Sequence, residues 1–222
     1  MTATEPFWQS FTDASAHRAG PYTDRYPAMV DEARCLVLPL RVLPGDGNRA
    51  VASLLVNHAS FAVSAWLAAA MAREARALKP EVIVGLPTLG LTLAPHVAQT
   101  LGFPNFVPLG YSRKFWYRDD LSVEISSVTS PGQGKRLYLD PHLMPRLEGR
   151  RVVIVDDVVS RGTSLASARR LMDMAGVNLV GAVVAMAQTN VWREPLRGLD
   201  VRFAFASPGF ERRGDGFWPI KD

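Results

Sequence analysis

The sequence has a single cysteine, Cys35, among its 222 residues. One cysteine excludes a disulfide within the chain and a metal site built from several thiolates. Its position in the apolar run CLVLPL predicts a small buried side chain rather than a reactive thiol. Because this composition fits a reducing compartment, we expect a cytoplasmic protein.

Long apolar runs and a secretory leader are also missing. The longest apolar stretch, FAVSAWLAAAMA at 61–72, is well short of the ~20 residues that cross a bilayer. The first twenty residues have no basic stretch followed by an apolar run, which a secretory signal requires. We therefore expect no contact with a membrane.

Charge of one sign is not concentrated at any point of the chain. The 25 Lys and Arg outnumber the 21 Asp and Glu, and the formal net charge is +4, but the basic residues are scattered. Binding of nucleic acid usually requires a basic cluster or stripe. We therefore expect a small anionic ligand and no nucleic acid partner. The four histidines lack the spacing of metal ligands, so they are predicted to be structural.

Length and composition predict one α/β domain. The 48% hydrophobic and 21% charged residues are ordinary for a globular protein, and 222 residues are too few for two ordinary domains. We expect a single domain over 1–222, with a core at 51–187 and peripheral segments at about 1–50 and 188–222. Pro and Gly interrupt the first fifty residues, which hold one strand-like run, CLVLPLRVL, and predict an irregular hood.

Strand-like and helical patterns alternate in the middle of the chain. A long helix is predicted over 52–78, where Ala, Leu, Met and Arg recur at helical spacing. Four short apolar runs follow, with helical patterns after the first and the third. The runs are EVIVGLP, NFVPLG, RVVIVDD and NLVGAVVAMA, and the helical patterns are GLTLAPHVAQTLG and GTSLASARRLMDMAG. This alternation predicts a mostly parallel sheet with helices on both faces. The polar, poorly periodic stretch 111–148 predicts a functional or mobile loop.

Two adjacent carboxylates end the third apolar run. In RVVIVDDVVSRGTSLASARR the run leads directly into Asp156 and Asp157, followed by a loop of small residues and a helix. Buried carboxylates are costly unless something pairs with them, and ligands of open α/β sheets bind at this edge. The loop at 160–164 offers hydroxyls and unobstructed amides at a helix N-terminus, which suits a phosphate. For an isolated pair of aspartates, a solvated acidic turn with a Ser/Thr helix cap is the alternative.

The whole string resembles the ligand signature of the type I phosphoribosyltransferases, which use 5-phosphoribosyl 1-pyrophosphate (PRPP). The resemblance implies their α/β fold: a central, mostly parallel sheet flanked by helices, with a small hood from the N-terminal segment and the region after the last core strand. It implies that Asp156 and Asp157 are catalytic residues that bind the ribose hydroxyls, directly or through Mg²⁺. The residues implied to hold the 5-phosphate are Ser160, Arg161, Gly162, Thr163 and Ser164.

Two further segments follow the order of motifs in this family. The first occupies the position of the family's pyrophosphate loop, where small residues let backbone amides approach a diphosphate. The alternative is an ordinary turn before a helix. Its residues are Pro87, Thr88, Leu89 and Gly90. The second contains Arg113 and Lys114, at the root of the catalytic loop. Cations there would neutralise charge on the departing pyrophosphate, and a solvent-facing basic turn is the alternative.

Recognition of the base is less clearly marked. The spacing of the motifs resembles the adenine and xanthine enzymes most, and the candidate base contacts are Val158 and Trp192. Trp192 stacks on a flat base or packs beside Pro195. The glutamate that is implicated in proton transfer in the adenine enzymes has no counterpart in TSPGQGK at 129–135. The hypoxanthine and guanine enzymes carry an aspartate where this chain has Ser160.

Taken together, the resemblance implies an Mg²⁺-dependent enzyme of nucleotide salvage. It would transfer ribose 5-phosphate from PRPP to a nucleobase, a purine by preference, and act as a homodimer. Two alternatives stay open. A regulator of the same fold would sense PRPP without catalysis, although the N-terminal segment has no helix-turn-helix pattern. An orotate-type enzyme has the same loop length as DDVVSRGTS.

Overall fold

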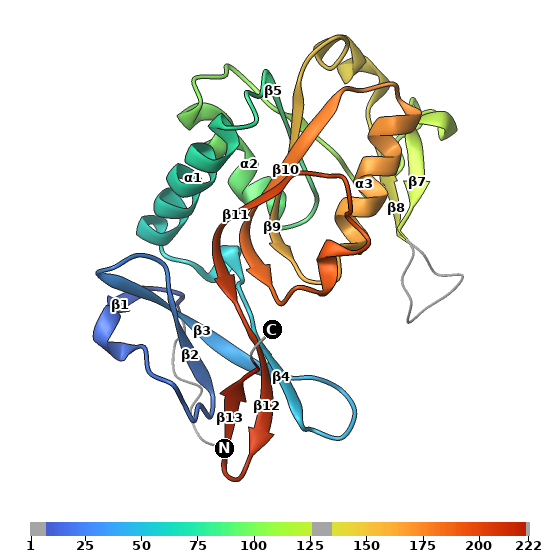
Figure 1. Cartoon of the computed structure of the whole chain (residues 1–222). Helices are drawn as coiled ribbons and strands as arrows, with labels where there is room; N and C mark the ends of the chain where they lie inside the picture. The colour runs from blue at the N-terminus through green and yellow to red at the C-terminus, as the bar shows by residue number, and fades with distance from the viewer. Residues whose placement is uncertain (1–7, 126–134, 221–222) are drawn as a thin grey trace.

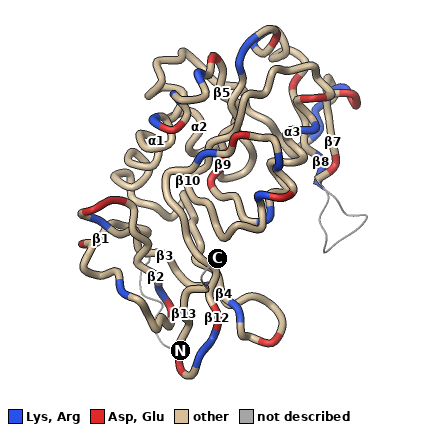
Figure 2. Tube along the Cα trace, viewed as in Figure 1, with Lys and Arg blue, Asp and Glu red and all other residues tan. Residues whose placement is uncertain are grey.

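The computed structural model describes residues 8–125 and 135–220, so residues 129–134 of the TSPGQGK segment lie outside the described part. Figure 1 shows an α/β core in the upper half of the view and a smaller β-sheet hood in the lower half. In Figure 2, Lys and Arg are interspersed with Asp and Glu along both parts. Within 8–125 and 135–220, no helix is long and apolar enough to cross a bilayer.

A five-stranded parallel sheet forms the centre of the core, with the strand order β11-β10-β9-β5-β6. The strands are β5 (Val82–Gly85), β6 (Val107–Pro108), β9 (Val152–Val159), β10 (Leu179–Gln188) and β11 (Val201–Ser207). All four residues of β5 and the first five of β9 are buried, because helices cover both faces of the sheet. The carboxyl ends of the strands face the hood (Figure 1). The predicted parallel α/β fold is therefore confirmed.

Three helices pack on this sheet. α1 (Phe61–Arg76) and α2 (Gly90–Thr100) share one apolar cluster, and α3 (Thr163–Met174) belongs to a second. The long helix begins at Phe61 rather than near Ala52, because the Ser60 side chain accepts a hydrogen bond from the Val63 amide at 3.3 Å and caps the helix there. Ala52 ends a strand of the hood instead.

The hood is a six-stranded antiparallel sheet built from both ends of the described chain. Its strands are β1 (Phe11–Asp13), β2 (Arg25–Met29), β3 (Arg34–Val42), β4 (Arg49–Ala52), β12 (Gly209–Arg213) and β13 (Gly216–Pro219). The predicted hood is confirmed, but it is regular rather than irregular. The sequence did not predict strands β1, β2 and β4, because they are short and because Pro27 interrupts the strand pattern of β2.

The region after residue 187 contributes to both layers. Strand β11 pairs along β10 and extends the core sheet, whereas the periphery was expected to begin at 188. Four of its seven residues are only half-buried, as is usual for an edge strand, so it lacks a continuous apolar run.

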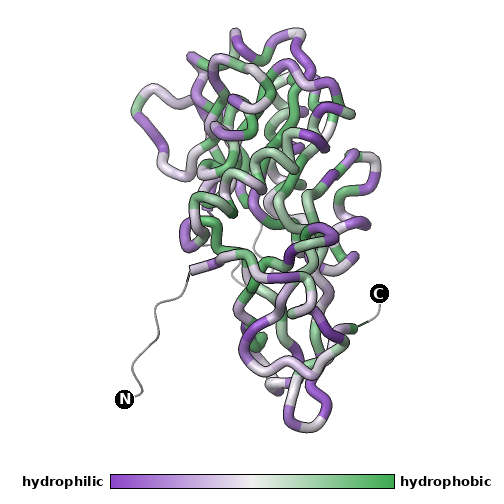
Figure 3. Tube along the Cα trace, turned by 90° about the vertical axis from the view of Figure 1, so that its left-hand side faces the viewer, coloured by the Kyte–Doolittle hydropathy of each residue, from purple (hydrophilic) through white to green (hydrophobic). Residues whose placement is uncertain are grey.

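A single apolar cluster joins Leu36 and Phe210 of the hood with Val155 of the core. Figure 3 shows hydrophobic segments inside both parts.

The stretch 111–148 contains more structure than a loop. Its described residues, 111–125 and 135–148, form two short 3₁₀ helices, η3 (Asp119–Leu121) and η4 (Pro141–Arg146), and the antiparallel pair of β7 (Ser122–Glu124) and β8 (Arg136–Tyr138). The guanidinium of Arg170 on α3 donates to the Glu124 carbonyl oxygen at 2.7 Å and anchors this pair. Its strands have three residues each, too few to produce a visible alternation.

Candidate active site

Strand β9 carries the two aspartates to the carboxyl edge of the sheet. Asp156 is only 6% exposed, and its Oδ1 accepts a hydrogen bond from the Asp157 amide at 2.9 Å. Burial raises the pKa of Asp156 well above its usual value, and the charge of Asp157 raises it further. Burial also raises the pKa of Asp157. Since both carboxylates lose hydration and repel each other, hydroxyl donors or a cation would stabilise the pair.

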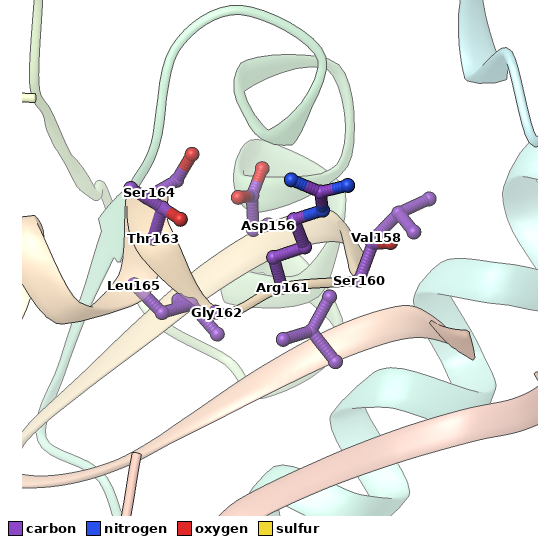
Figure 4. Close-up of a pocket in the computed structure, with 9 residues that line it drawn as sticks. Asp156, Val158, Ser160, Arg161, Gly162, Thr163, Ser164 and Leu165 are labelled. Atoms are coloured by element: carbon purple, nitrogen blue, oxygen red, sulfur yellow. The ribbon is translucent and has the colours of Figure 1, made fainter. Parts of the chain in front are cut away.

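A cavity of about 290 Å³ lies beside Asp156, between β9 and α3. It is lined by Asp156, Val158, Val159, Ser160, Arg161, Gly162, Thr163, Ser164 and Leu165. Figure 4 shows the Asp156 carboxylate, the Arg161 guanidinium and the Ser164 hydroxyl on the same side of the loop. The structure therefore brings one predicted ribose contact together with every residue predicted for the 5-phosphate.

Gly162 determines how α3 begins. Its φ of 79° lies in the left-handed region, and a Cβ at this position would approach Leu196 Cγ to 3.1 Å. As the N-cap residue it has no side chain with which to cap the helix. The first amides of α3 thus remain suited to an external acceptor, and the positive end of the helix dipole favours an anion.

The predicted pyrophosphate loop lies directly against the acid pair. Its last residue, Gly90, begins α2, and a Cβ there would lie 2.8 Å from Asp156 Oδ1 and 2.9 Å from the Val155 carbonyl oxygen. The N-cap residue of α2 is Leu89, whose side chain cannot accept a hydrogen bond. Helix α2 therefore also presents an N-terminus suited to an anion, whereas α1 is capped by Ser60.

Tyr111 also lies at this site, although no motif in the sequence pointed to it. Its hydroxyl donates to the carbonyl oxygen of Pro87 at 2.7 Å. Burial raises the pKa of Tyr111, and the charges of Asp156 and Asp157 raise it further, so the phenol lies within the field of the acid pair. The available signal was its position directly after the NFVPLG strand, at the edge where the other motifs also end.

The predicted catalytic cations lie outside the cavity. Arg113 and Lys114 are both exposed, and neither lines the space beside Asp156. Arg113 Nη1 lies 3.0 Å from Asp119 Oδ1. Contact with a departing pyrophosphate would require this segment to approach the cavity, so their catalytic role stays a prediction.

The two candidate base contacts differ in position. Val158 lines the cavity. Trp192 is 4% exposed, and its Nε1 donates to the Thr189 carbonyl oxygen at 2.9 Å. The ring belongs to the same apolar cluster as Leu196, which contacts the start of α3. This placement favours packing over base stacking for Trp192.

The donor set at the acid pair fits a magnesium ion shared with the ligand. Among the described residues, no group of three or more His, Cys, Asp or Glu gathers into a metal site. Two carboxylates suffice for Mg²⁺, because this ion keeps several waters and takes phosphate oxygens as further ligands. Asp156 and Asp157 are the residues that would hold it.

The chain is similar in sequence to known phosphoribosyltransferases. The family model described as phosphoribosyl transferase domain matches residues 50–204, a wider range than the motifs themselves. An adenine phosphoribosyltransferase of Corynebacterium efficiens is 33% identical over 145 residues, which cover 60% of this chain and 65% of that protein. One of Acidothermus cellulolyticus is 30% identical over 138 residues, covering 62% and 72%. The match thus spans slightly less than two thirds of the Corynebacterium relative.

Solved structures support the fold independently. An adenine phosphoribosyltransferase of Saccharomyces cerevisiae superimposes with a TM-score of 0.59 at 22% identity, over 76% of this chain and 94% of that one. One of Thermoanaerobacter pseudethanolicus gives 0.53 at 23% identity, over 63% and 80%. Because the family model covers more than half of the chain, this protein belongs to the phosphoribosyl transferase domain family.

Proposed function

We propose that this protein transfers ribose 5-phosphate from PRPP to a purine base and releases pyrophosphate. One observation carries the proposal: the N-termini of α2 and α3 flank the buried acid pair. The N-cap residue of each helix has no side chain that can accept a hydrogen bond from the first amides. PRPP carries a phosphate at one end of its ribose, a diphosphate at the other and two hydroxyls between them. The relatives named adenine phosphoribosyltransferase favour adenine as the base.

In this proposal each segment performs a separate task. The loop at 160–164 binds the 5-phosphate, the loop at 87–90 binds the pyrophosphate, and Asp156 and Asp157 hold the ribose hydroxyls. The bond between ribose C1 and the pyrophosphate oxygen breaks, and the oxygen keeps the electron pair. A base nitrogen forms the new bond to C1 and gives up its proton to the departing pyrophosphate or to water. Amides already oriented at the α2 N-terminus stabilise the charge that develops on pyrophosphate. Bound Mg²⁺ would supply further positive charge there.

Calorimetry with PRPP and Mg²⁺, followed by a screen for pyrophosphate release, tests this function. The bases are adenine, xanthine, hypoxanthine, guanine and orotate. We expect PRPP to bind and adenine to give the fastest release. Binding without release for any base would favour the PRPP sensor, and release with orotate alone would favour the orotate-type enzyme. Absence of PRPP binding would overturn the proposal.

We expect Lys114→Ala to lower kcat and kcat/KM together, by about tenfold. A cation that meets charge developing on pyrophosphate acts mainly in the transition state, and tenfold corresponds to about 1.4 kcal/mol. Steady-state kinetics with varied PRPP measures both constants. The control is Arg118→Ala, which removes an exposed cation of the same segment that is paired with Asp120. A rise in KM with unchanged kcat would contradict this role for Lys114.

Four further parts of the proposal rest on the family, on the composition or on packing. Mg²⁺ dependence and a homodimer follow from the resemblance to the type I enzymes, and a cytoplasmic location follows from the single cysteine. The apolar cluster shared by Leu36, Val155 and Phe210 supports a single domain over 1–222. We expect one cooperative unfolding transition by calorimetry, and two separate transitions would speak for two domains.

A further inference from the structure

The side chain of Tyr111 bridges two adjacent strands at the edge where the ligand would bind. Pro87 follows β5 and Tyr111 follows β6, and these strands pair in parallel. The amide of Leu109 extends the pairing with a hydrogen bond of 3.0 Å to the Gly85 carbonyl oxygen. Beyond this point the backbones no longer pair, and the Tyr111 hydroxyl reaches the Pro87 carbonyl oxygen at 2.7 Å.

The backbone holds Tyr111 firmly. Gly110, the preceding residue, exchanges two hydrogen bonds with Tyr138 of β8: its amide donates at 3.1 Å and its carbonyl oxygen accepts at 2.8 Å. The Lys135 Nζ lies 5.3 Å from the centre of the Tyr111 ring. The phenol is half-buried. A side chain fixed in this way can impose its geometry on a partner.

The partner is the first peptide of the loop at 87–90. The Pro87 carbonyl and the Thr88 amide belong to one planar unit, so a hydrogen bond that fixes the oxygen also fixes the direction of the amide. A backbone amide binds an anion only along its N–H direction. The orientation of this loop therefore depends on a hydroxyl that lies outside it in sequence.

We propose that Tyr111 is a positioning residue that holds the loop at 87–90 in the orientation that binds pyrophosphate. The inference rests on the proposed function and deepens it, because it assigns the affinity for pyrophosphate partly to a residue outside the loop. Tyr111 touches the loop, not the 5-phosphate site at 160–164. We therefore expect its main influence at the pyrophosphate end of PRPP.

The test replaces Tyr111 by phenylalanine, which removes the hydroxyl and keeps the ring. Three probes are titrated with Mg²⁺ present: PRPP, inorganic pyrophosphate and ribose 5-phosphate. We expect Tyr111→Phe to weaken PRPP and pyrophosphate by about 3- to 10-fold, the effect of one neutral hydrogen bond. Binding of ribose 5-phosphate, which lacks the diphosphate, should stay within twofold. The control Tyr117→Phe changes a tyrosine of the same segment that packs on Tyr138, and it should alter none of the three affinities.

The outcomes separate this inference from the proposed function. If wild-type protein does not bind PRPP, the proposed function fails. If wild type binds PRPP and Tyr111→Phe binds all three probes equally well, the positioning role is wrong and the proposed function stands. If the variant loses ribose 5-phosphate as strongly as pyrophosphate, the hydroxyl supports the whole site rather than the loop, and the inference is also overturned.

Discussion

Replacing Asp157 by asparagine is expected to weaken the binding of PRPP, with Mg²⁺ present, by at least ~100-fold. The carboxylate would accept hydrogen bonds from the ribose hydroxyls, or bind the Mg²⁺ ion that coordinates their oxygens. Hydrogen bonds to charged groups contribute about 1.5–3 kcal/mol each, and two of them account for a loss of this size. Isothermal titration with PRPP measures it.

The same variant should not lose stability. Burial and the charge of Asp157 raise the pKa of Asp156, and burial raises that of Asp157, so the empty site disfavours having both carboxylates charged. A neutral amide at 157 removes the repulsion, and we expect the Tm of the unliganded variant to equal or exceed that of wild type. Lower affinity with retained Tm identifies a ligand-binding group, whereas a large fall in Tm would indicate a structural one.

Asp120→Asn is the matched control. Asp120 lies in the segment that precedes β7, is exposed and is paired with Arg118, so its change should leave PRPP affinity within twofold. If Asp157→Asn binds PRPP as well as Asp120→Asn does, the acid pair is not the ribose site. The cavity beside β9 would then need another ligand.

Sequence alone predicted the parts of the site that are contiguous in the chain. The string from Arg151 to Arg170 contains a strand, the acid pair, a loop and a helix, and each of these has a recognisable local sequence pattern. The cavity brings Asp156 and the loop at 160–164 together because they are neighbours in sequence as well as in space. Local sequence patterns were therefore sufficient to predict this part of the candidate site.

Contacts between distant segments were not predictable in the same way. The hydrogen bond from Tyr111 to Pro87 depends on the pairing of β5 with β6. The hood depends on β12 returning to pair with β4, although nothing in either short strand identifies its partner. Trp192 illustrates the same limit: its side chain suits stacking or packing equally, and only the fold places it in the apolar cluster that contains Leu196.

Gly90→Ala is expected to reduce kcat/KM for PRPP by ~100-fold and to lower stability as well. The added methyl would meet Asp156 Oδ1 at 2.8 Å and the Val155 carbonyl oxygen at 2.9 Å, distances that side-chain carbons do not adopt. Helix α2 must therefore move away from β9 and take the loop at 87–90 with it. A displacement of about 1 Å at a catalytic site can cost ~100-fold in rate.

The direction of the stability change makes Gly90→Ala informative. At an unobstructed helix position, exchange of glycine for alanine stabilises by roughly 0.5–1 kcal/mol, whereas overpacking destabilises by about 1–3 kcal/mol. For Gly90 we expect the second effect to prevail and the Tm to fall by several degrees. Gly110→Ala is the matched control, because a Cβ there meets nothing within 4 Å and its φ is not in the left-handed region. Differential scanning calorimetry measures the Tm of both variants, and steady-state kinetics measures their kcat/KM for PRPP. If Gly90→Ala raises the Tm and retains activity, as we expect of Gly110→Ala, then the close approach of the α2 N-terminus to Asp156 is not required. The loop at 87–90 would in that case bind its anion by another arrangement.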